Sequence, residues 1–220
     1  MKRVVTPEIL DSLPHDDPAA VANRRDLRLV NGLMGNHRWL EKQLHRHLKK
    51  GDQVLEIGAG TGELGLRLQR KALLSDTGFT GLDLWPSPKQ WPKEWGWLQT
   101  DLSSYEGYEP FTVIIANLIL HQFSDDVLHH LGGLWRGGCP RLLLINEPVR
   151  RSLHLWQLRL LPALGFHPVS RHDARVSVRA GFRRGELPSR LGLNTREWSL
   201  AESETWFGAY RLRAERRAGS

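Results

Sequence analysis

Acidic and glycine residues cluster in one short stretch where they could hold a ligand. Residues 54–64 are Val-Leu-Glu-Ile-Gly-Ala-Gly-Thr-Gly-Glu-Leu, in which an apolar run containing Glu56 leads into glycines at 58, 60 and 62. Glycines let the backbone bend sharply and let a ligand lie against it without contact from a Cβ atom. The free N–H groups of the helix that follows would face the same ligand. The stretch therefore predicts a ligand-binding turn between a buried strand and a helix.

Two common glycine-rich loops do not fit this stretch. The dinucleotide-binding pattern G-x-G-x-x-G requires a glycine where Glu63 stands, and no Gly-Lys-Ser/Thr triplet follows to make a phosphate-binding P-loop. Asp83 lies 25 residues after Gly58, at the end of the next predicted strand, 79–84. That spacing suits an acid that binds the two hydroxyls of a ribose. A nicotinamide enzyme is therefore disfavoured, although a ribose-containing ligand is expected.

Polar residues also end the later predicted strands. Asp101 ends the predicted strand 96–101, and Asn117 ends the strongly β-prone run 111–117. His121 lies just beyond that run, where a histidine can act as a general base near neutral pH. The alternative for His121 is a polar residue that packs against the helix it precedes.

The elements that must position these residues alternate between helices and strands. Two helices, from about 18 and over 37–49, precede the first strand, whereas residues 1–17 form a loose lead-in. The expected order then continues with strand 54–57, helix 63–74, strands 79–84, 96–101 and 111–117, helix 124–135, strand 141–147, helix 149–164, the unassigned segment 165–193, and a hairpin at 197–200 and 207–212. Right-handed crossovers would place helices on both faces of a mostly parallel sheet.

Four segments in this order resemble motifs of the class I S-adenosylmethionine (SAM)-dependent methyltransferases. Residues 56–62, E-x-G-x-G-x-G, are similar to motif I, and 81–84 resemble the ribose-binding segment. Residues 98–102 resemble the adenine-binding segment, and 116–121 resemble motif IV of small-molecule enzymes related to quinone-biosynthesis methyltransferases. The resemblance covers roughly residues 50–150. It implies an α/β, Rossmann-like class I methyltransferase fold with a mostly parallel seven-stranded sheet, a C-terminal antiparallel β-hairpin, and SAM as the cofactor.

The resemblance also implies roles for single residues. Glu56 would orient the methionine ammonium, or else cap the loop, and Asp83 would bind the ribose. Asp101 and Leu102 would meet the adenine, unless Asp101 only caps a helix. Asn117 would face the methionine moiety. The expected cofactor-binding residues are Glu56, Gly58, Ala59, Gly60, Thr61, Gly62, Asp83, Leu84, Asp101, Leu102, Asn117 and Leu118.

Residues 172–182 lie outside the general pattern. They resemble a sequence signature of a bacterial subfamily associated with type III polyketide synthases. We expect the surrounding segment 165–193 to recognise the acceptor at the C-terminal ends of the strands. His172 and Asp173 are therefore rivals to His121 as catalytic residues.

Arg179 and Gln122 are the expected acceptor-binding residues. Arg179 lies between apolar neighbours, and a buried arginine needs an anionic partner. We expect at least one arginine of this region to pair with Asp173, Glu186 or the acceptor.

Charge and composition bound the remaining possibilities. The formal net charge is +7, and residues 149–220 hold fourteen arginines, no lysine and six acids. Such a basic third suggests nucleic-acid binding, or an arginine-rich solvated surface. Cys139, the only cysteine, excludes an intrachain disulfide, and the ten histidines lack metal-ligand spacing, so no metal is expected. Without an apolar run of about 18 residues or a signal peptide, a cytoplasmic protein without a membrane span is expected.

These observations predict a single SAM-dependent methyltransferase domain over 1–220, with a helical lid at 1–50, a SAM-binding core at 51–148, and an acceptor-side segment with the hairpin at 149–220. Five tryptophans between Trp39 and Trp97 favour an aromatic or lipid-like acceptor pocket. The expected reaction methylates a small molecule, on a hydroxyl of an aromatic, quinone-like or polyketide compound. An RNA methyltransferase using the basic third and a non-catalytic SAM-binding module are the alternatives, and the oligomeric state is left open.

Overall fold

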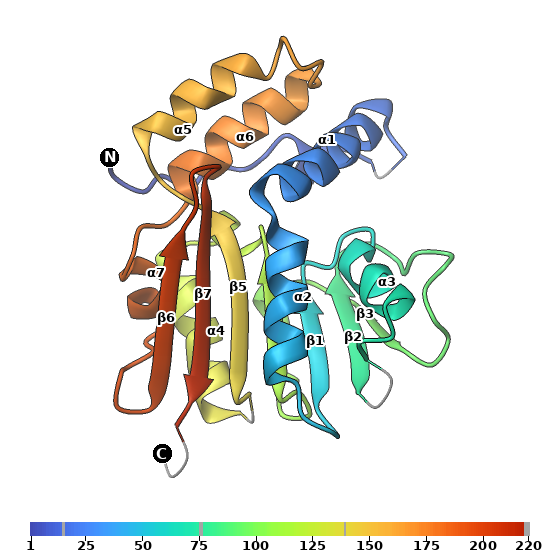
Figure 1. The fold of residues 1–220 in the computed structure, drawn as a ribbon. Helices are drawn as coiled ribbons and strands as arrows, with labels where there is room; N and C mark the ends of the chain where they lie inside the picture. The colour runs from blue at the N-terminus through green and yellow to red at the C-terminus, as the bar shows by residue number, and fades with distance from the viewer. Residues whose placement is uncertain (15, 75–76, 139, 218–220) are drawn as a thin grey trace.

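A seven-stranded sheet in the order β3-β2-β1-β4-β5-β7-β6 forms the centre of the computed structural model (Figure 1), which describes residues 1–14, 16–74, 77–138 and 140–217. Strands β1 to β5 pair in parallel, whereas β7 is antiparallel to both β5 and β6. The predicted fold class, including the terminal hairpin, is confirmed. The strands are β1 (Gln53–Ile57), β2 (Gly78–Asp83), β3 (Gly96–Gln99), β4 (Val113–Asn117), β5 (Leu142–Pro148), β6 (Trp198–Glu204) and β7 (Ala209–Arg216).

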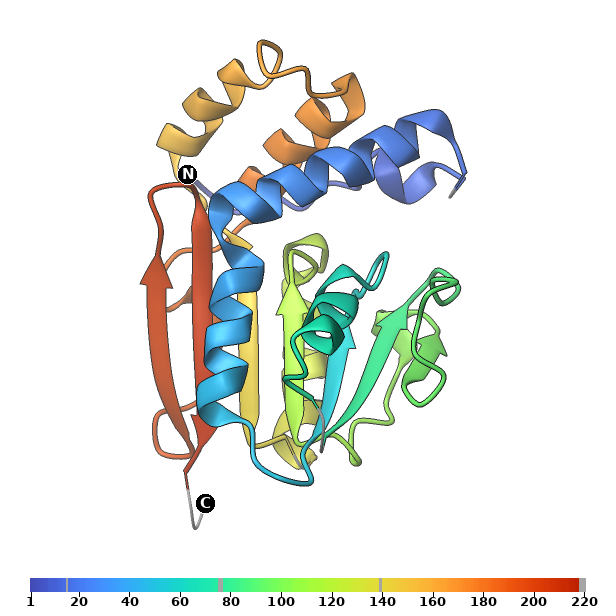
Figure 2. The same ribbon diagram turned by 45° about the vertical axis from the view of Figure 1, so that its right-hand side comes forward.

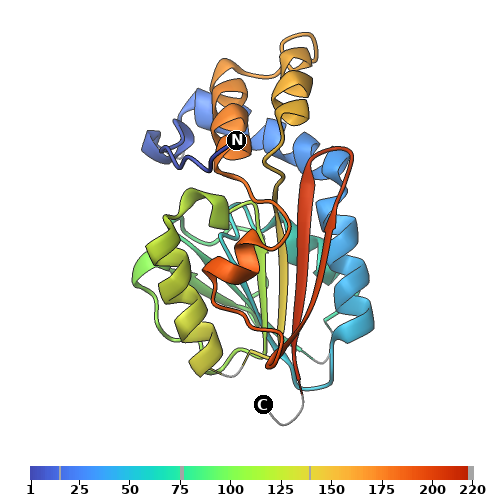
Figure 3. The same cartoon turned by 90° about the vertical axis from the view of Figure 1, so that its left-hand side faces the viewer.

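The central strands are apolar on both faces, so helices cover both sides of the sheet (Figure 3). In β1, Leu55 and Ile57 join one hydrophobic cluster and Val54 joins the other, as the two-residue period of a strand requires. The first cluster includes residues of α4 (Asp125–Gly137) and α7 (Glu186–Arg190), and the second includes residues of α2 (Asn36–His47) and α3 (Glu63–Arg70). Because Leu40 and Leu44 of α2 are fully buried in this core, α2 covers the sheet and is not part of a lid.

The remaining longer helices lie beyond the C-terminal ends of the parallel strands (Figures 1 and 2). We call them, with the chain that joins them, the lid. Its helices are α1 (Pro18–Met34), α5 (Ser152–Gln157) and α6 (Pro168–Ala180), with the 3-10 turns η1 (Leu10–Ser12) and η4 (Leu158–Leu160). The expected single helix 149–164 is thus two short pieces, and the unassigned segment 165–193 contains α6 and α7. The lid covers the edge of the sheet at which the glycine loop opens.

The N-terminal segment is fixed to the protein, and the prediction of a loose lead-in was wrong. The Arg3 guanidinium donates to the carbonyl oxygens of Ala180 at 2.8 Å, His121 at 3.0 Å and Phe123 at 2.8 Å. The Val4 N–H donates to the Arg179 carbonyl at 3.2 Å. Residues 3–11, which we call the N-terminal strap, therefore join α6 to the loop that follows β4.

Candidate cofactor and acceptor site

The glycine loop adopts a backbone that favours glycine. Gly58, Gly60 and Gly62 have φ angles of 66°, 55° and 67°, in the left-handed region that other residues adopt only with strain. A Cβ atom at Gly58 would lie 2.7 Å from Ile119, whereas one at Gly60 would meet no atom within 4 Å. The loop is therefore open at Gly60, where a ligand can approach the backbone, and packed against the protein at Gly58 and Gly62.

Glu56 lies beneath this loop with an unpaired carboxylate oxygen. The residue is 4% exposed, and its Oε2 has no hydrogen-bond partner. Burial, with smaller contributions from the negative charges of Asp83 and Glu63, raises the pKa of Glu56 to about 8. A buried acceptor without a partner is costly, so the site is suited to a ligand that brings a cationic N–H donor.

Asp83 joins the glycine loop to the end of β2. Its Oδ2 accepts a hydrogen bond from the Gly60 N–H at 2.7 Å, and its Oδ1 accepts one from the Trp85 N–H at 3.0 Å. Burial raises the pKa of Asp83, although these hydrogen bonds oppose the shift. Each carboxylate oxygen has capacity for a second donor, so Asp83 can hold the loop and still accept from two ribose hydroxyls.

Asp101 caps a helical turn in this structure. It precedes η2 (Leu102–Ser104), and its Oδ1 accepts from the Ser103 N–H and hydroxyl, both at 2.8 Å. This is the capping role that the sequence left open. Leu102 is buried and Leu84 is exposed, so an adenine contact for these residues remains a prediction.

Asn117 connects the lid to the sheet. Its Nδ2 donates to Asn31 Oδ1 of α1 at 3.0 Å, and its Oδ1 accepts from Asn146 Nδ2 of β5 at 3.4 Å. The next residue, Leu118, has a φ of 59°. A branched side chain in this region is strained, and such strain is concentrated at functional sites. The turn after β4 is therefore held in a special conformation at the same edge as the glycine loop.

The carboxylate of Glu147 holds this turn in place. It lies at the end of β5 and is fully buried. Its Oε1 accepts from the N–H groups of Ile119 at 3.1 Å and Leu120 at 2.8 Å, and its Oε2 accepts from the N–H of His121 at 3.2 Å. Glu147 thus satisfies three successive amides at the start of η3 (Leu120–Gln122), which no local partner could satisfy.

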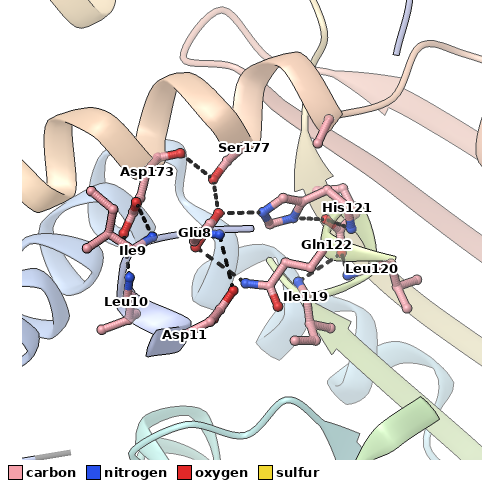
Figure 4. A network of polar contacts seen from close by, with 12 residues as sticks. Glu8, Ile9, Leu10, Asp11, Ile119, Leu120, His121, Gln122, Asp173 and Ser177 are labelled. Carbon is pink, nitrogen blue, oxygen red and sulfur yellow. Dashed lines mark hydrogen bonds and ion pairs between the residues drawn. The ribbon is translucent and has the colours of Figure 1, made fainter. Parts of the chain in front are cut away.

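His121 is bound on both sides by carboxylates (Figure 4). Its Nδ1 lies 2.7 Å from Glu147 Oε2, and its Nε2 lies 3.2 Å from Glu8 Oε1 of the N-terminal strap. Glu8 also accepts hydrogen bonds from the Gln122 amide at 3.3 Å and from the Ser177 hydroxyl of α6. A carboxylate–imidazole–carboxylate row therefore runs from β5 through His121 to the strap.

The two carboxylates determine the charge of His121. Burial alone would lower its pKa, but the hydrogen bonds to Glu147 and Glu8 outweigh it and raise the pKa to about 9. The same contact with His121 keeps the pKa of Glu8 below its usual range in spite of burial. At neutral pH, His121 is a buried imidazolium, which favours a fixed positive charge over the free general base suggested by the sequence.

Of the two rival catalytic residues, Asp173 holds the strap. Asp173, buried on α6, accepts from the N–H groups of Ile9 at 2.9 Å and Leu10 at 3.2 Å (Figure 4). It also accepts from the Asn23 side chain at 3.1 Å. The half-exposed His172 lies 3.1 Å from the same carboxylate. Asp173 therefore positions the strap, and a direct role for either residue in proton transfer remains a prediction.

The expected arginine contact involves another arginine. Arg179 is exposed at the end of α6, so its binding of the acceptor remains a prediction. The arginine that pairs with Glu186 is Arg150, which is buried and bonds that carboxylate at 2.5 and 3.0 Å. The sequence pattern favoured Arg179 because its neighbours are apolar, but Val178 and Ala180 are buried whereas the Arg179 side chain between them is exposed.

Several other arginines of the basic third bind the protein itself. Arg216 donates to the carbonyls at the end of α4 and stacks over Trp198 at 5.1 Å, and Arg211 donates to the carbonyl of Met34 at 2.8 Å. Arg190 pairs with Asp125 at 2.8 Å. These arginines join elements of the fold and do not gather at the glycine loop, which weakens the argument for RNA binding.

Three of the tryptophans form core structure. Trp91, Trp95 and Trp97 pack with Phe79, with ring centroids 4.9 Å apart for Phe79–Trp95 and for Trp91–Trp97. A Cβ at Gly62 would lie 2.7 Å from the Trp91 ring, so this cluster supports the glycine loop from the protein side. The idea that they line an acceptor pocket was wrong for these three.

Sequence reasoning missed Glu8 and Glu147. Glu147 is an acid near the end of a parallel strand, as Glu56 and Asp83 are. The same pattern could therefore have identified it as a site residue. No local sequence pattern could identify Glu8, because its contact partner His121 lies 113 residues away in the chain.

No group of three or more histidine, cysteine, aspartate or glutamate side chains suited to a metal ion occurs within the described part of the chain. Cys139 lies outside the described residues. None of the described helices has the length and apolar character needed to cross a membrane.

The strand order, the terminal hairpin and the glycine loop define a Rossmann-like methyltransferase fold, and solved structures match it. The plantazolicin methyltransferase BamL, solved with a triazolic desmethylPZN analog and SAH, is 12% identical, with a TM-score of 0.69 over 94% of this chain and 92% of that one. The magnesium protoporphyrin IX methyltransferase ChlM from Synechocystis PCC 6803, with bound SAM, is 14% identical, with a TM-score of 0.55 over 95% and 88%.

A third similar structure is the methyltransferase domain of bacterial CtHen1, 13% identical with a TM-score of 0.52 over 84% of this chain and 97% of that one. No protein-family model matches the sequence, and no curated protein matches it. At these identities the likeness establishes the fold.

Proposed function

We propose that this protein is a SAM-dependent methyltransferase that methylates a small-molecule acceptor, on a hydroxyl of an aromatic, quinone-like or polyketide compound. The observation that carries the proposal is the buried, unpaired carboxylate oxygen of Glu56 beside Asp83 at the open glycine loop. A ligand with an ammonium group for Glu56 and a ribose for Asp83 matches SAM. The fold neighbours crystallised with SAM or SAH support the same cofactor.

The protein's own residues would bind and align the reactants. When bound, SAM supplies a methyl group on a positively charged sulfur, which departs as a neutral thioether. The protein therefore needs no group to stabilise a leaving charge, and its main task is to hold the acceptor in line at about 3 Å. The turn after β4, fixed by Glu147 and by Asn117, lies at the edge of the sheet where that alignment must occur.

His121 has no ring N–H left for the acceptor, because its two nitrogens face the carboxylates of Glu147 and Glu8. One imidazolium between two carboxylates gives the row a net charge of −1, so the role that suits His121 is to hold the turn after β4 and the strap in place beside the acceptor. A phenol or a similar acidic hydroxyl suits such a site, because it loses its proton more readily than an alcohol. The proton of the acceptor then passes to solvent or to a carboxylate of the row, since His121 is already protonated.

Replacing Asp83 with alanine should weaken SAM binding by about 1.5–3 kcal/mol, the usual range for hydrogen bonds to a charged group. The variant loses the ribose acceptors and also the bond that holds the Gly60 N–H. Titration calorimetry of the folded variant measures the loss, with Asp101→Ala as a control expected to lose less. Unchanged affinity in Asp83→Ala would remove this residue from the cofactor site.

Replacing Glu56 with glutamine should have opposite effects on stability and on binding. The pKa of Glu56 in the folded protein, about 8, lies above the ordinary glutamate pKa of 4.5, so the stabilising contribution of Glu56 is lost as the pH rises from about 4.5 to 8. Glu56→Gln should therefore make the ligand-free protein more stable at pH 8. Its SAM affinity should fall, because an ammonium prefers the ionised carboxylate.

The pH dependence of calorimetric affinity tests the same point. In the wild-type protein, SAM affinity should rise up to about pH 8, with proton release on binding, whereas Glu56→Gln should show neither effect. Equal pH profiles for both proteins would contradict the assignment of the ammonium to Glu56.

The acceptor class is tested by incubating the protein with methyl-labelled SAM and a panel of phenols, quinols, alkylresorcinols and short RNAs. Label transfer to a hydroxyl compound supports the proposal. Transfer to RNA, with RNA affinity that falls steeply with salt, would support the alternative. SAM binding without transfer to any acceptor would favour a non-catalytic module.

A further inference from the structure

The large exposed apolar residues of the lid include four along α5, η4 and the turn that follows η4. Leu153, Trp156, Leu160 and Leu164 are 38%, 59%, 56% and 62% exposed. Leu153 and Trp156 lie three residues apart on α5, Leu160 ends η4, and Leu164 lies in the turn beyond it. The other side packs inward, since Leu161 and Phe166 are buried. The segment is thus anchored to the lid and presents a second, unpartnered apolar face.

The turn between β6 and β7 extends this face. Trp206 and Phe207 at its tip are 70% and 61% exposed. The turn lies directly beside the start of α5 in all three views (Figures 1, 2 and 3), and the Val149 N–H donates to the Gly208 carbonyl at 2.8 Å. We call the combined surface the lid patch, made up of Leu153, Trp156, Leu160, Leu164, Trp206 and Phe207.

The surroundings of the lid patch are strongly basic. Residues 150–181 contain six arginines and a single acid, Asp173. That acid is buried and occupied by the strap, whereas Arg159, Arg175 and Arg179 are exposed. Arg150 and Arg151 are paired with Glu186 and Glu204, so the positive charge that this part of the lid presents comes from Arg159, Arg175 and Arg179.

We propose that the lid patch docks this protein on the surface of an anionic lipid bilayer. Exposed tryptophan and leucine with arginine beside them is the composition of segments that lie in a membrane interface. Positive charge near the surface adds attraction to anionic headgroups. An exposed apolar patch of this kind marks a site of interaction with a protein or a membrane. The inference depends on the lid surface alone and does not require the proposed methyl transfer.

Docking in this orientation would turn the lid and the C-terminal ends of the strands toward the bilayer. An acceptor dissolved in the membrane could then reach the site without crossing water. This would give the lid a role in acceptor delivery, in addition to the contacts by which it holds the strap and the turn after β4.

Co-sedimentation of the full-length protein with vesicles tests the proposal. We expect binding to vesicles of phosphatidylcholine with phosphatidylglycerol, weaker binding to phosphatidylcholine alone, and a decrease with added salt. The double variant Trp156→Ser/Trp206→Ser should lose at least about tenfold in vesicle affinity, since it lacks the two largest apolar groups of the patch.

Two matched charge variants test whether vesicle binding depends on the lid patch or only on the overall positive charge of the protein. Arg159→Glu should weaken binding by about fivefold or more. Arg196→Glu makes the same charge change at an exposed position before β6, at the far end of the hairpin, and should leave binding unchanged. Circular dichroism and SAM binding confirm that each variant is folded.

Three results would overturn the proposal: absence of binding by the wild-type protein to anionic vesicles, equal binding by the patch variants, or equal loss in Arg159→Glu and Arg196→Glu. A concentration-dependent dimer that Trp156→Ser/Trp206→Ser abolishes, without vesicle binding, would instead identify the patch as an interface between copies of the chain.

Discussion

Replacing Glu147 with alanine is expected to destabilise the ligand-free protein by about 3–5 kcal/mol, the range for breaking a buried ion pair. The carboxylate is fully buried and lies 2.7 Å from the His121 ring. Its removal leaves the imidazolium with Glu8 as its remaining described carboxylate contact. It also leaves the N–H groups of Ile119, Leu120 and His121 without their acceptor.

Glu147→Gln separates the two parts of this effect. A glutamine carbonyl can still accept hydrogen bonds from the backbone amides of the turn after β4, but it carries no charge. Glu147→Gln should therefore lose less unfolding free energy than Glu147→Ala. The difference between the two variants measures the contribution of the retained amide contacts. The His121 pKa, measured by NMR titration, should fall in both variants because the largest favourable contact is removed.

Urea denaturation of both variants measures the change in unfolding free energy. Glu215→Ala is the control, because Glu215 is a partly exposed acid paired with Arg213 at 2.7 Å, and exposed pairs contribute at most about 1 kcal/mol. If Glu147→Ala and Glu215→Ala unfold at the same urea concentration, Glu147 does not hold the turn.

Local sequence patterns were sufficient for the sheet and for the glycine loop. The apolar runs around Val54 and Val113 are short and continuous, as expected for strands buried on both faces. The three alternate glycines occupy left-handed positions that few other residues adopt. Each of these features depends on residues close together in the chain, so the sequence alone could predict them.

Features that depend on distant contacts could not be predicted. The strap has no apolar period of its own, and its position depends on Asp173 and on Arg3, which contact residues more than a hundred positions away. The protonation of His121 likewise depends on Glu8 of the strap and Glu147 of β5, which are far apart in the chain. The position of His121 after β4 was enough to identify it as a candidate site residue. Its charge state could not be predicted from the sequence.

Replacing His121 with glutamine is expected to lower methyl transfer by about 10²-fold, the loss that a misplacement of about 1 Å at the reacting atoms can cause, because the row that fixes the turn after β4 and the strap is broken. SAM affinity should remain nearly unchanged, because Glu56 and Asp83 lie on other strands. His172→Ala is the matched control, a half-exposed histidine of the lid, and should keep most of the activity. Loss in His172→Ala with retention in His121→Gln would exchange their roles.

The pH profile distinguishes the charged role of His121 from that of a free base. Its pKa is raised from 6.5 to about 9, so the ring is protonated at neutral pH and loses its proton as the pH passes about 9. The associated stabilisation is fully present below pH 6.5 and is lost as the pH rises through 9. If the imidazolium is the active form, turnover by the wild-type protein should be level near neutrality and fall above about pH 9. Turnover that instead rises with pH toward 9, with the rise absent in His121→Gln, would show that neutral His121 is the base.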